Sequence, residues 1–356
     1  MVESYKQKIA RLVAQNAPLG IDPDVKIEGR VPTMASSEFL TNKQQGDWAE
    51  EVVFNAINNH SSEYVAVQYG RSESLAAGDE GFDDFYRCYQ DELNTIGKRP
   101  DILIFKRSDI ASQTVDMNDD IVRKAVAAIE VRSSSFLADK YAKFMEERSN
   151  TAIQACLTIR QELVFGELSD LLKEKAPELF RLLESATPAT FRELDFRARS
   201  WSTTEALKKL SELLKKLKEQ INVLHKRDYL SITPKLEDVA LVNRWIQTFN
   251  VPHFYLQVFF DKAFVIPFQQ ILEISSDPSK EGVVFSVEKD SKNQGKTTIK
   301  INIQVGKEVI GKIEMPDHVS AVKELDRGRL LFFVKFKGGK GYLDQAVFER
   351  EIINHV

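Results

Sequence analysis

The spacing of hydrophobic residues changes along this chain, and each change predicts a different element. In GDWAEEVVFNAINN (46–59) the apolar residues recur at helical intervals. These residues are Trp48, Ala49, Val52, Val53, Ala56 and Ile57. EYVAVQYG (63–70) predicts a strand, and the polar, irregular segment 71–98 that follows contains aromatic residues compatible with a short helix.

Two short apolar runs come next. RPDILIF (99–105) and KAVAAIEVRSS (124–134) each predict a buried strand, because short apolar runs rich in β-formers and bounded by polar residues fit a strand. The polar turn SDIASQTVDMNDD (108–120) separates them. This order predicts a hairpin or two close neighbours in one sheet.

From residue 136 to about 226 the pattern is helical. Apolar residues there recur at intervals of four and three, which predicts the seam of a helical hairpin or short coiled coil. They are Leu210, Leu214, Leu217, Ile221 and Leu224. The lysines around this seam, between Lys208 and Lys218, form either a solvated helix face or a surface that meets phosphates.

A second helix is expected in LEDVALVNRWIQTFN, with Thr233 as an N-cap ahead of Pro234 and an end near Asn250. VPHFYLQVFFD (251–261) and FVIPF (264–268) then predict strands. Beyond about residue 277, apolar stretches separated by turn residues predict a β-rich tail. They are GVVFSVEKD, KTTIKINIQV, EVIGKIEMP and RLLFFVKF.

These elements predict an α/β protein with a mixed central sheet flanked by helices, a helical insertion and a β-rich C-terminal part. The expected organisation is a peripheral segment at 1–44, a main domain at 45–275 with its insertion at about 160–230, and the β-rich region at 276–356.

Composition narrows the class of protein. The chain is 43% hydrophobic and 29% charged, with a formal net charge of -4, so it is not a basic coat for nucleic acid, although a local basic cleft is compatible with this total. No apolar run is long enough to predict a membrane span, and MVESYKQKIARL has no features of a signal peptide. Two cysteines form neither a disulfide framework nor a metal cluster, and a cytoplasmic setting is expected.

Two carboxylates in the predicted strands stand out. Asp101 opens one apolar strand, and Glu130 lies near the end of the other. Two carboxylates that share a site repel each other, and a bound divalent cation such as Mg²⁺ relieves the repulsion. The alternatives are a turn role for Asp101 after Pro100 and an ion pair between Glu130 and Arg132, which share a strand face.

Pro100-Asp101 and Glu130-Val131-Arg132 resemble the PD…(D/E)xK signature of metal-dependent nucleases. An upstream helix carries a glutamate in that superfamily, and GDWAEEVV is similar, which favours Glu50. The ordered segments RPDILIF, AIEVRSSSF, TPKLEDV and NVPHFYLQVFFD are, more narrowly, similar to type II restriction endonucleases of the AccI kind. The resemblance covers about residues 45–275 and implies a restriction-endonuclease-like fold.

The resemblance also implies roles for individual residues. Asp101, Glu130 and the backbone carbonyl of Val131 would hold Mg²⁺, and Glu50 would support the metal or its water. Arg132 would stabilise the phosphate.

One position departs from the family pattern. The third motif residue is usually lysine, and here it is Arg132, which cannot act as a base. Lys235 is a candidate for a lysine supplied from elsewhere, and otherwise lies on the first turn of a helix. Ser133 and Ser134 either bind phosphate oxygens of DNA or end the strand.

The expected activity is therefore Mg²⁺-dependent cleavage of double-stranded DNA at a specific sequence. A restriction endonuclease further implies a homodimer that reads a short palindrome and a cognate DNA methyltransferase in the same system. Two alternatives remain: a structure-specific or repair nuclease, and a catalytically inactive DNA-binding protein of the same fold, which the arginine at position 132 keeps open.

Overall fold

A computed structural model describes residues 3–32, 34–70, 75–110, 119–290, 296–325 and 328–355. The chain divides into two compact units, which we call the sheet unit (Met1–Ala138 and Ser231–Val356) and the helical unit (Asp139–Leu230). The helical unit begins earlier in the chain than the insertion expected from about residue 160. The expected polar turn at 108–120 falls mainly on residues 111–118, which lie outside the described residues, as do residues 71–74.

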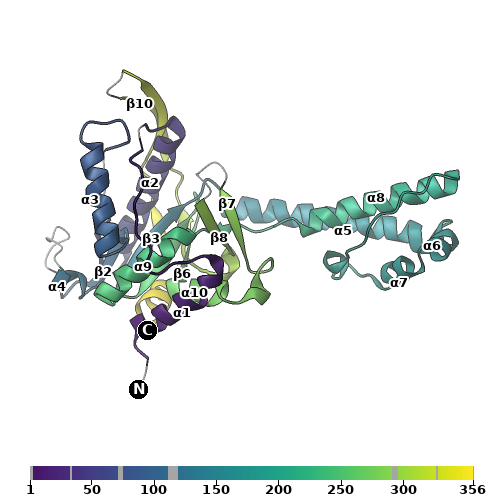
Figure 1. Ribbon diagram of the computed structural model, residues 1–356, viewed down its shortest axis with the longest axis horizontal. Coiled ribbons are helices and arrows are strands. Elements are labelled where there is room, and N and C mark those ends of the chain that lie inside the picture. Colours follow the sequence, from purple (N-terminus) through teal and green to yellow (C-terminus); the bar gives the residue numbers. More distant parts are fainter. Residues whose placement is uncertain are drawn as a thin grey trace. The chain divides into compact units, whose positions relative to one another are not determined.

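The sheet unit is built on a mixed sheet (Figure 1). Within the described residues its strand order is β1-β2-β3-β5-β6-β9-β12. The strands are β1 (Tyr64–Gln68), β2 (Ile102–Lys106), β3 (Ala127–Ser133), β5 (His253–Val258), β6 (Ala263–Pro267), β9 (Lys307–Ile313) and β12 (Gly341–Leu343). β3 and β5 are parallel and the other neighbours antiparallel. The predicted mixed central sheet is confirmed, and β2 and β3 are adjacent in it.

Helices cover both faces of this sheet. The α-helices are α1 (Tyr5–Gln15), α2 (Ser37–His60), α3 (Phe82–Thr95), α4 (Asp119–Val122), α9 (Leu236–Phe249), α10 (Phe268–Ser275) and α11 (Gln345–Phe348). Shorter turns are η1 (Ala17–Leu19), η3 (Pro278–Lys280), η4 (Ile303–Val305) and the π-turn η5 (Glu349–Ile353). α2 packs in the core of one face, and α1, α9 and α10 pack in the core of the other.

Side chains of β3 alternate between these two cores, as the period of a strand requires. Ile129 and Val131 pack with α2, whereas Ala128 packs on the α9 side. Glu130 and Arg132 share the face of Ala128, so they point towards α9. The sequence of β3 thus places an acid and a cation side by side under a helix.

The β-rich C-terminal part is confirmed, but it is distributed over the sheet unit. β9 and β12 extend the central sheet. β7 (Phe285–Asp290) and β8 (Lys296–Asn302) form a second sheet with β4 (Ser231–Ile232), and β10 (Asp317–Glu324) pairs with β11 (Leu330–Lys337). The sequence pattern did not predict β10, whose residues are mostly exposed and lack the apolar alternation of a buried strand.

The helical unit consists of α5 (Ala138–Phe165), α6 (Ser169–Lys175), α7 (Pro177–Ser185), the turn η2 (Phe191–Glu193) and α8 (Glu205–His225). α5 and α8 lie side by side and share one core (Figure 1). The predicted seam of α8 is buried in that core from Leu210 to Leu224. Among the described residues, no helix has both the length and the apolar character to cross a membrane.

Gly97 fixes the connection between α3 and β2 against α9. Its φ is +85°, a conformation that favours glycine, and a Cβ there would lie 2.2 Å from the Leu241 carbonyl oxygen and 2.7 Å from the Trp245 nitrogen. The next residue, Lys98, donates its backbone N–H to the same Leu241 carbonyl at 3.1 Å. A side chain at position 97 would therefore push this connection away from α9.

We expect Gly97→Ala to destabilise the protein more than Gly81→Ala, which is a matched control. Gly81 has a φ of +79° but nothing within 4 Å of an added Cβ. Both substitutions carry a left-handed backbone cost of about 1–2 kcal/mol, and only Gly97→Ala adds the clash, worth about 1–3 kcal/mol more. Urea unfolding measures both; equal losses of stability would contradict the close packing on α9.

Candidate functional site

Asp101 and the end of β3 are joined by a direct hydrogen bond. The last paired residues of β2 and β3 at this end are Ile102 and Ile129, so the next outward-facing amide of β3, that of Val131, has no strand partner in β2. The Val131 N–H donates instead to Asp101 Oδ2 at 2.6 Å. Two backbone amides, of Tyr69 and Gly70, donate to the Asp101 carbonyl at 2.9 and 3.1 Å. Asp101 is therefore held at both its backbone and its side chain.

Gly70 allows this close approach. A Cβ at position 70 would lie 3.1 Å from Asp101 Cα and 3.3 Å from Asp101 Oδ1. Gly70 follows the end of β1 and packs directly on Asp101. On its other side, Asp101 lies beside Glu130 of β3.

Glu130 lies in a ring of alternating charges, which we call the charge quartet: Lys98, Glu130, Arg132 and Asp238. Lys98 Nζ lies 2.5 Å from Glu130 Oε1 and 2.8 Å from Asp238 Oδ2. Arg132 Nη2 lies 3.1 Å from the same Glu130 oxygen and 2.7 Å from the same Asp238 oxygen. Both cations thus contact the same two carboxylate oxygens, one from Glu130 and one from Asp238. The formal charges of the four side chains cancel.

The quartet is buried, and three separate parts of the chain assemble it. The Glu130 side chain is 3% exposed and the other three side chains are 16–20% exposed. Lys98 comes from the connection that Gly97 packs on α9, Arg132 comes from β3, and Asp238 comes from the first turn of α9. Burying a charge costs several kcal/mol unless it is paired, so each member of the ring makes the burial of the others tolerable.

The electrostatics keep both quartet acids ionised. Burial raises the pKa of Glu130, but the charges of Lys98 and Arg132 outweigh it and lower this pKa below its ordinary value. The pKa of Asp238 is lowered for the same reasons, with a smaller contribution from Lys235. Lys98 and Arg132 remain charged, because the two acids raise the pKa of each despite burial.

Asp101 and Glu50 behave in the opposite way. Burial, together with the charges of Glu130 and Glu50, raises the pKa of Asp101 well above its ordinary value. Burial, with Asp47 and Glu130, raises the pKa of Glu50 to about 7. Asp101, Glu130 and Glu50 therefore lie close enough that they resist being negative together without an added cation.

The structure distinguishes Glu50 from Glu51. Both follow Ala49 in α2, but Glu50 is half-buried and within electrostatic reach of Glu130 and Asp101, whereas Glu51 is exposed. The helical period explains the difference, because neighbours on a helix differ by about 100° in direction.

The remaining predicted residues lie around this centre. Lys235 is the N-cap of α9 and influences the pKa of Asp238, whereas the lysine that contacts Glu130 is Lys98. Ser133 and Ser134, at the end of β3, are half-buried, and their side chains make no hydrogen bond within the described residues.

Thr233 does not cap α9, as the sequence pattern suggested. The helix begins two residues later, after Lys235, and Thr233 donates from its N–H and hydroxyl to Gln257 Oε1 at 3.2 and 3.0 Å. Gln257 is buried and pairs with Arg132 in the register of β5 and β3. This amide therefore ties the entry to α9 to the strand beside the quartet.

Sequence reasoning missed two members of the quartet, Lys98 and Asp238. Lys98 precedes Asp101 by three residues in KRPD, but a lysine in a polar connection resembles any solvated lysine. Asp238 lies in the first turn of α9, where the helix dipole favours any acidic residue, so its sequence position gives no sign of a second role. No spacing in the sequence relates residue 238 to residue 130.

The carboxylate pair fits a small divalent cation. Glu130 Oε2 is buried and makes no hydrogen bond, so one oxygen of a charged carboxylate lacks a partner within the described residues. Because the N–H and C=O of a strand residue point to the same side, the Val131 carbonyl faces the edge where its N–H meets Asp101. The described residues contain no group of three or more His, Cys, Asp or Glu side chains arranged to hold a metal. Mg²⁺ often binds through only one or two carboxylates.

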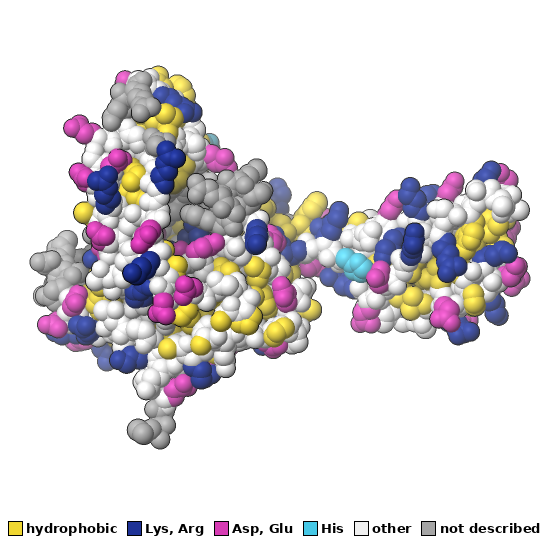
Figure 2. Space-filling view, in the orientation of Figure 1, with side chains coloured by type: hydrophobic (Ala, Val, Ile, Leu, Met, Phe, Trp, Pro, Cys, Tyr) yellow, Lys and Arg dark blue, Asp and Glu magenta, His cyan; other side chains and the backbone are white. Residues whose placement is uncertain are grey.

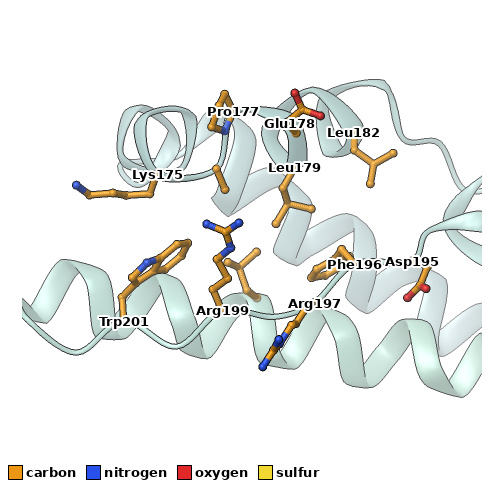
Figure 3. A pocket seen from close by; sticks show the side chains of 12 residues that line it. Lys175, Pro177, Glu178, Leu179, Leu182, Asp195, Phe196, Arg197, Arg199 and Trp201 are labelled. Carbon is orange, nitrogen blue, oxygen red and sulfur yellow. The ribbon is translucent and has the colours of Figure 1, made fainter.

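A separate pocket lies in the helical unit. It has a volume of about 470 Å³, and its lining includes Trp201, Phe196 and Arg199 (Figure 3). Arg199 points into the pocket beside Trp201, whereas Arg197 points away from the connection between α6 and α7. Neither arginine makes an ion pair or hydrogen bond in the part of the chain that the structure describes. Lys and Arg side chains are interspersed with hydrophobic ones on this unit (Figure 2).

The mixed sheet brings Asp101 and Glu130 together at the ends of the adjacent strands β2 and β3, beside the cations Lys98 and Arg132. The chain belongs to the AccI restriction endonuclease family, whose family model matches residues 5–354. It is thus an AccI-like type II restriction enzyme, a hydrolase that cuts DNA. The predicted resemblance is confirmed and extends beyond residues 45–275. Neither a curated protein nor a solved structure matches the chain.

The raised pKa of Glu50 predicts a pH-dependent cost in stability. Between pH 4.5, its ordinary pKa, and pH about 7, the unfolded chain is ionised at Glu50 while the folded chain is protonated. Stability therefore falls as pH rises through this window, and the full loss is present above pH 7. We expect Glu50→Gln to remove this loss, so that its Tm advantage over the wild type grows between pH 4.5 and 7 and then stays constant.

Thermal unfolding in chelator across this pH range measures the effect. Glu51→Gln, an exposed neighbour on the same helix, is the matched control and should show a constant difference from the wild type. Parallel curves for Glu50→Gln and the wild type would contradict the burial of Glu50 against the other acids.

Proposed function

We propose that this restriction enzyme hydrolyses double-stranded DNA at a specific sequence in a Mg²⁺-dependent reaction, with Asp101 and Glu130 as metal ligands. The observation that supports this most strongly is the buried, unpartnered Oε2 of Glu130 beside the constrained Asp101. A charged oxygen without a hydrogen bond is costly to bury, and a divalent cation supplies the missing partner.

The chain's own residues would hold and orient the reacting groups. Asp101, Glu130 and the carbonyl of Val131 would bind Mg²⁺, which when bound neutralises phosphate charge and lowers the pKa of a coordinated water. Glu50 would orient that water, since its pKa of about 7 lets it accept or hold a proton near neutral pH. Arg132 would stabilise the phosphate, because its Nη2 makes the ion pairs with Glu130 and Asp238, whereas its Nη1 makes no hydrogen bond within the described residues.

The assembly is also part of this proposal. A homodimer would match the two-fold symmetry of a short palindrome, and each copy would cut one strand. Ser133, Ser134 and Lys235, at the rim of the site, would contact the DNA backbone. A companion DNA methyltransferase would protect the host's own recognition sites.

Replacing Glu130 with Ala should lower DNA cleavage by at least about a hundredfold, because even outer-shell changes at metal sites cost 10–100-fold. Purified wild type and Glu130→Ala are incubated with phage and plasmid DNA, with Mg²⁺ or with chelator. We expect discrete fragments only when the wild type is incubated with Mg²⁺, and not in chelator or with Glu130→Ala. The ends of the fragments give the recognition sequence.

Glu51→Gln, exposed on the same helix as Glu50, is the control and should cut like the wild type. Cleavage of branched or damaged DNA only would support a structure-specific nuclease instead. Binding without any cleavage would support a catalytically inactive protein. Equal cleavage in Mg²⁺ and in chelator would overturn the metal-dependent reaction.

The helical unit is proposed to contact the DNA backbone through Arg197 and Arg199. These exposed cations have no described ionic partner, lie two residues apart, and neighbour Trp201 in the pocket of this unit. Lys208 and Lys218 of α8 differ, since they pair with Glu205 and Asp195. An arginine without an ion pair binds a phosphate more favourably, because an arginine that is already paired must first give up its interaction with the acid.

Reversing both charges, in Arg197→Glu/Arg199→Glu, should weaken DNA binding and lower the slope of log affinity against log salt by about 2. Fluorescence anisotropy with a duplex in Ca²⁺ or chelator measures it. Lys209→Glu/Lys216→Glu makes the same charge change on the exposed face of α8. If only Lys209→Glu/Lys216→Glu weakens DNA binding, the DNA-contacting surface lies on α8 and the proposed role of the two arginines is refuted.

A further inference from the structure

The charge quartet has a consequence for the neighbouring carboxylates. Its two cations both contact Glu130 Oε1, which leaves Oε2 unpartnered within the described residues. Both cations also contact Asp238 Oδ2, which makes no described contact with Asp101. Asp238 therefore balances part of the charge of Lys98 and Arg132. The second oxygen of Glu130, Oε2, is left for a further cation.

We infer that the quartet sets the affinity of the Asp101–Glu130 pair for a divalent cation, Lys98 lowering it and Asp238 raising it. This inference rests on the proposed metal-binding role of that pair. Asp238 is a positioning residue, because it holds the two cations through its own oxygen and acts on the metal only through them and Glu130.

The sign and the burial of the quartet charges determine the direction of each effect. With Asp238 neutral, Lys98 and Arg132 face Glu130 alone, and the group carries one net positive charge beside the incoming cation. With Lys98 neutral, the group carries one net negative charge instead. The side chains are at most 20% exposed, so salt screens these charges less than it would at the surface. The two changes must therefore shift cation affinity in opposite directions.

The geometry makes the two substitutions comparable. Lys98 and Asp238 contact each other at 2.8 Å, and each is 16–17% exposed. Lys98→Met keeps most of the side-chain volume, and Asp238→Asn keeps the shape of the carboxylate. A structural ion-pair network would instead lose stability in both variants, with no opposite effect on a bound cation.

Binding of Mn²⁺ to the full-length protein, measured by calorimetry without DNA, tests the inference. We expect Asp238→Asn to weaken Mn²⁺ binding by about tenfold and Lys98→Met to strengthen it by a similar factor. The double variant restores a neutral group and should bind within about threefold of the wild type. Asp238→Glu, which keeps the charge, should bind like the wild type.

Glu92→Gln is the matched control. Glu92 forms an ion pair with Arg99 at 2.6 Å beside the same connection, and its side chain is 11% exposed, but it is not a member of the quartet. This variant should leave Mn²⁺ affinity unchanged. If Asp238→Asn fails to fold, Lys98→Met alone tests the inference: stronger Mn²⁺ binding supports it, and unchanged or weaker binding overturns it.

The outcomes separate this inference from the proposed function. Loss of Mn²⁺ binding in Glu130→Ala with unchanged affinity in both quartet variants would leave the metal site standing and overturn the inference. Changes of the same sign in Lys98→Met and Asp238→Asn would overturn it as well. Mn²⁺ binding that persists in both Glu130→Ala and Asp101→Asn would instead refute the proposed metal ligands themselves.

Discussion

The burial of Glu130 is the constraint on which the rest of this site depends. A carboxylate that is 3% exposed in the middle of a sheet is tolerable only if cations reach it. Arg132, two residues along the same strand face, provides one of them. The other, Lys98, must come from a different segment, and Asp238 then has to balance the pair. One buried charge thereby dictates the packing of three segments.

That packing explains several features with no direct chemical role. Gly97 permits the connection that carries Lys98 to lie on the backbone of α9, and Gln257 ties the entry of α9 to β5. α9 must approach the sheet closely for Asp238 to meet Arg132 at 2.7 Å. The core of aromatic and aliphatic residues under α9 supplies the driving force for this approach. Hydrophobic burial and charge pairing therefore favour the same arrangement.

The acids of the site divide into two groups that share one neighbourhood. Glu130 and Asp238 are kept ionised by the cations around them, whereas Asp101 and Glu50 are driven towards the neutral form by burial and by Glu130 itself. Such divergence is frequent at functional sites, where neighbouring groups hold different protonation states. Here it means that either a proton or an added cation would relieve the repulsion within this cluster of carboxylates.

The sequence by itself determined most of the strands and the main helices, and it singled out the motif residues Asp101, Glu130 and Arg132. These follow from local periodicity and from a short ordered pattern, both of which are written in neighbouring residues. Only the tertiary structure decided which lysine meets Glu130, that Asp238 closes the ring, and that Glu50 rather than Glu51 faces the acids. Residues 98, 130 and 238 are related by packing across the sheet and α9. A pairing of that kind leaves no spacing in the chain, because the intervening segments can vary in length without changing the contact.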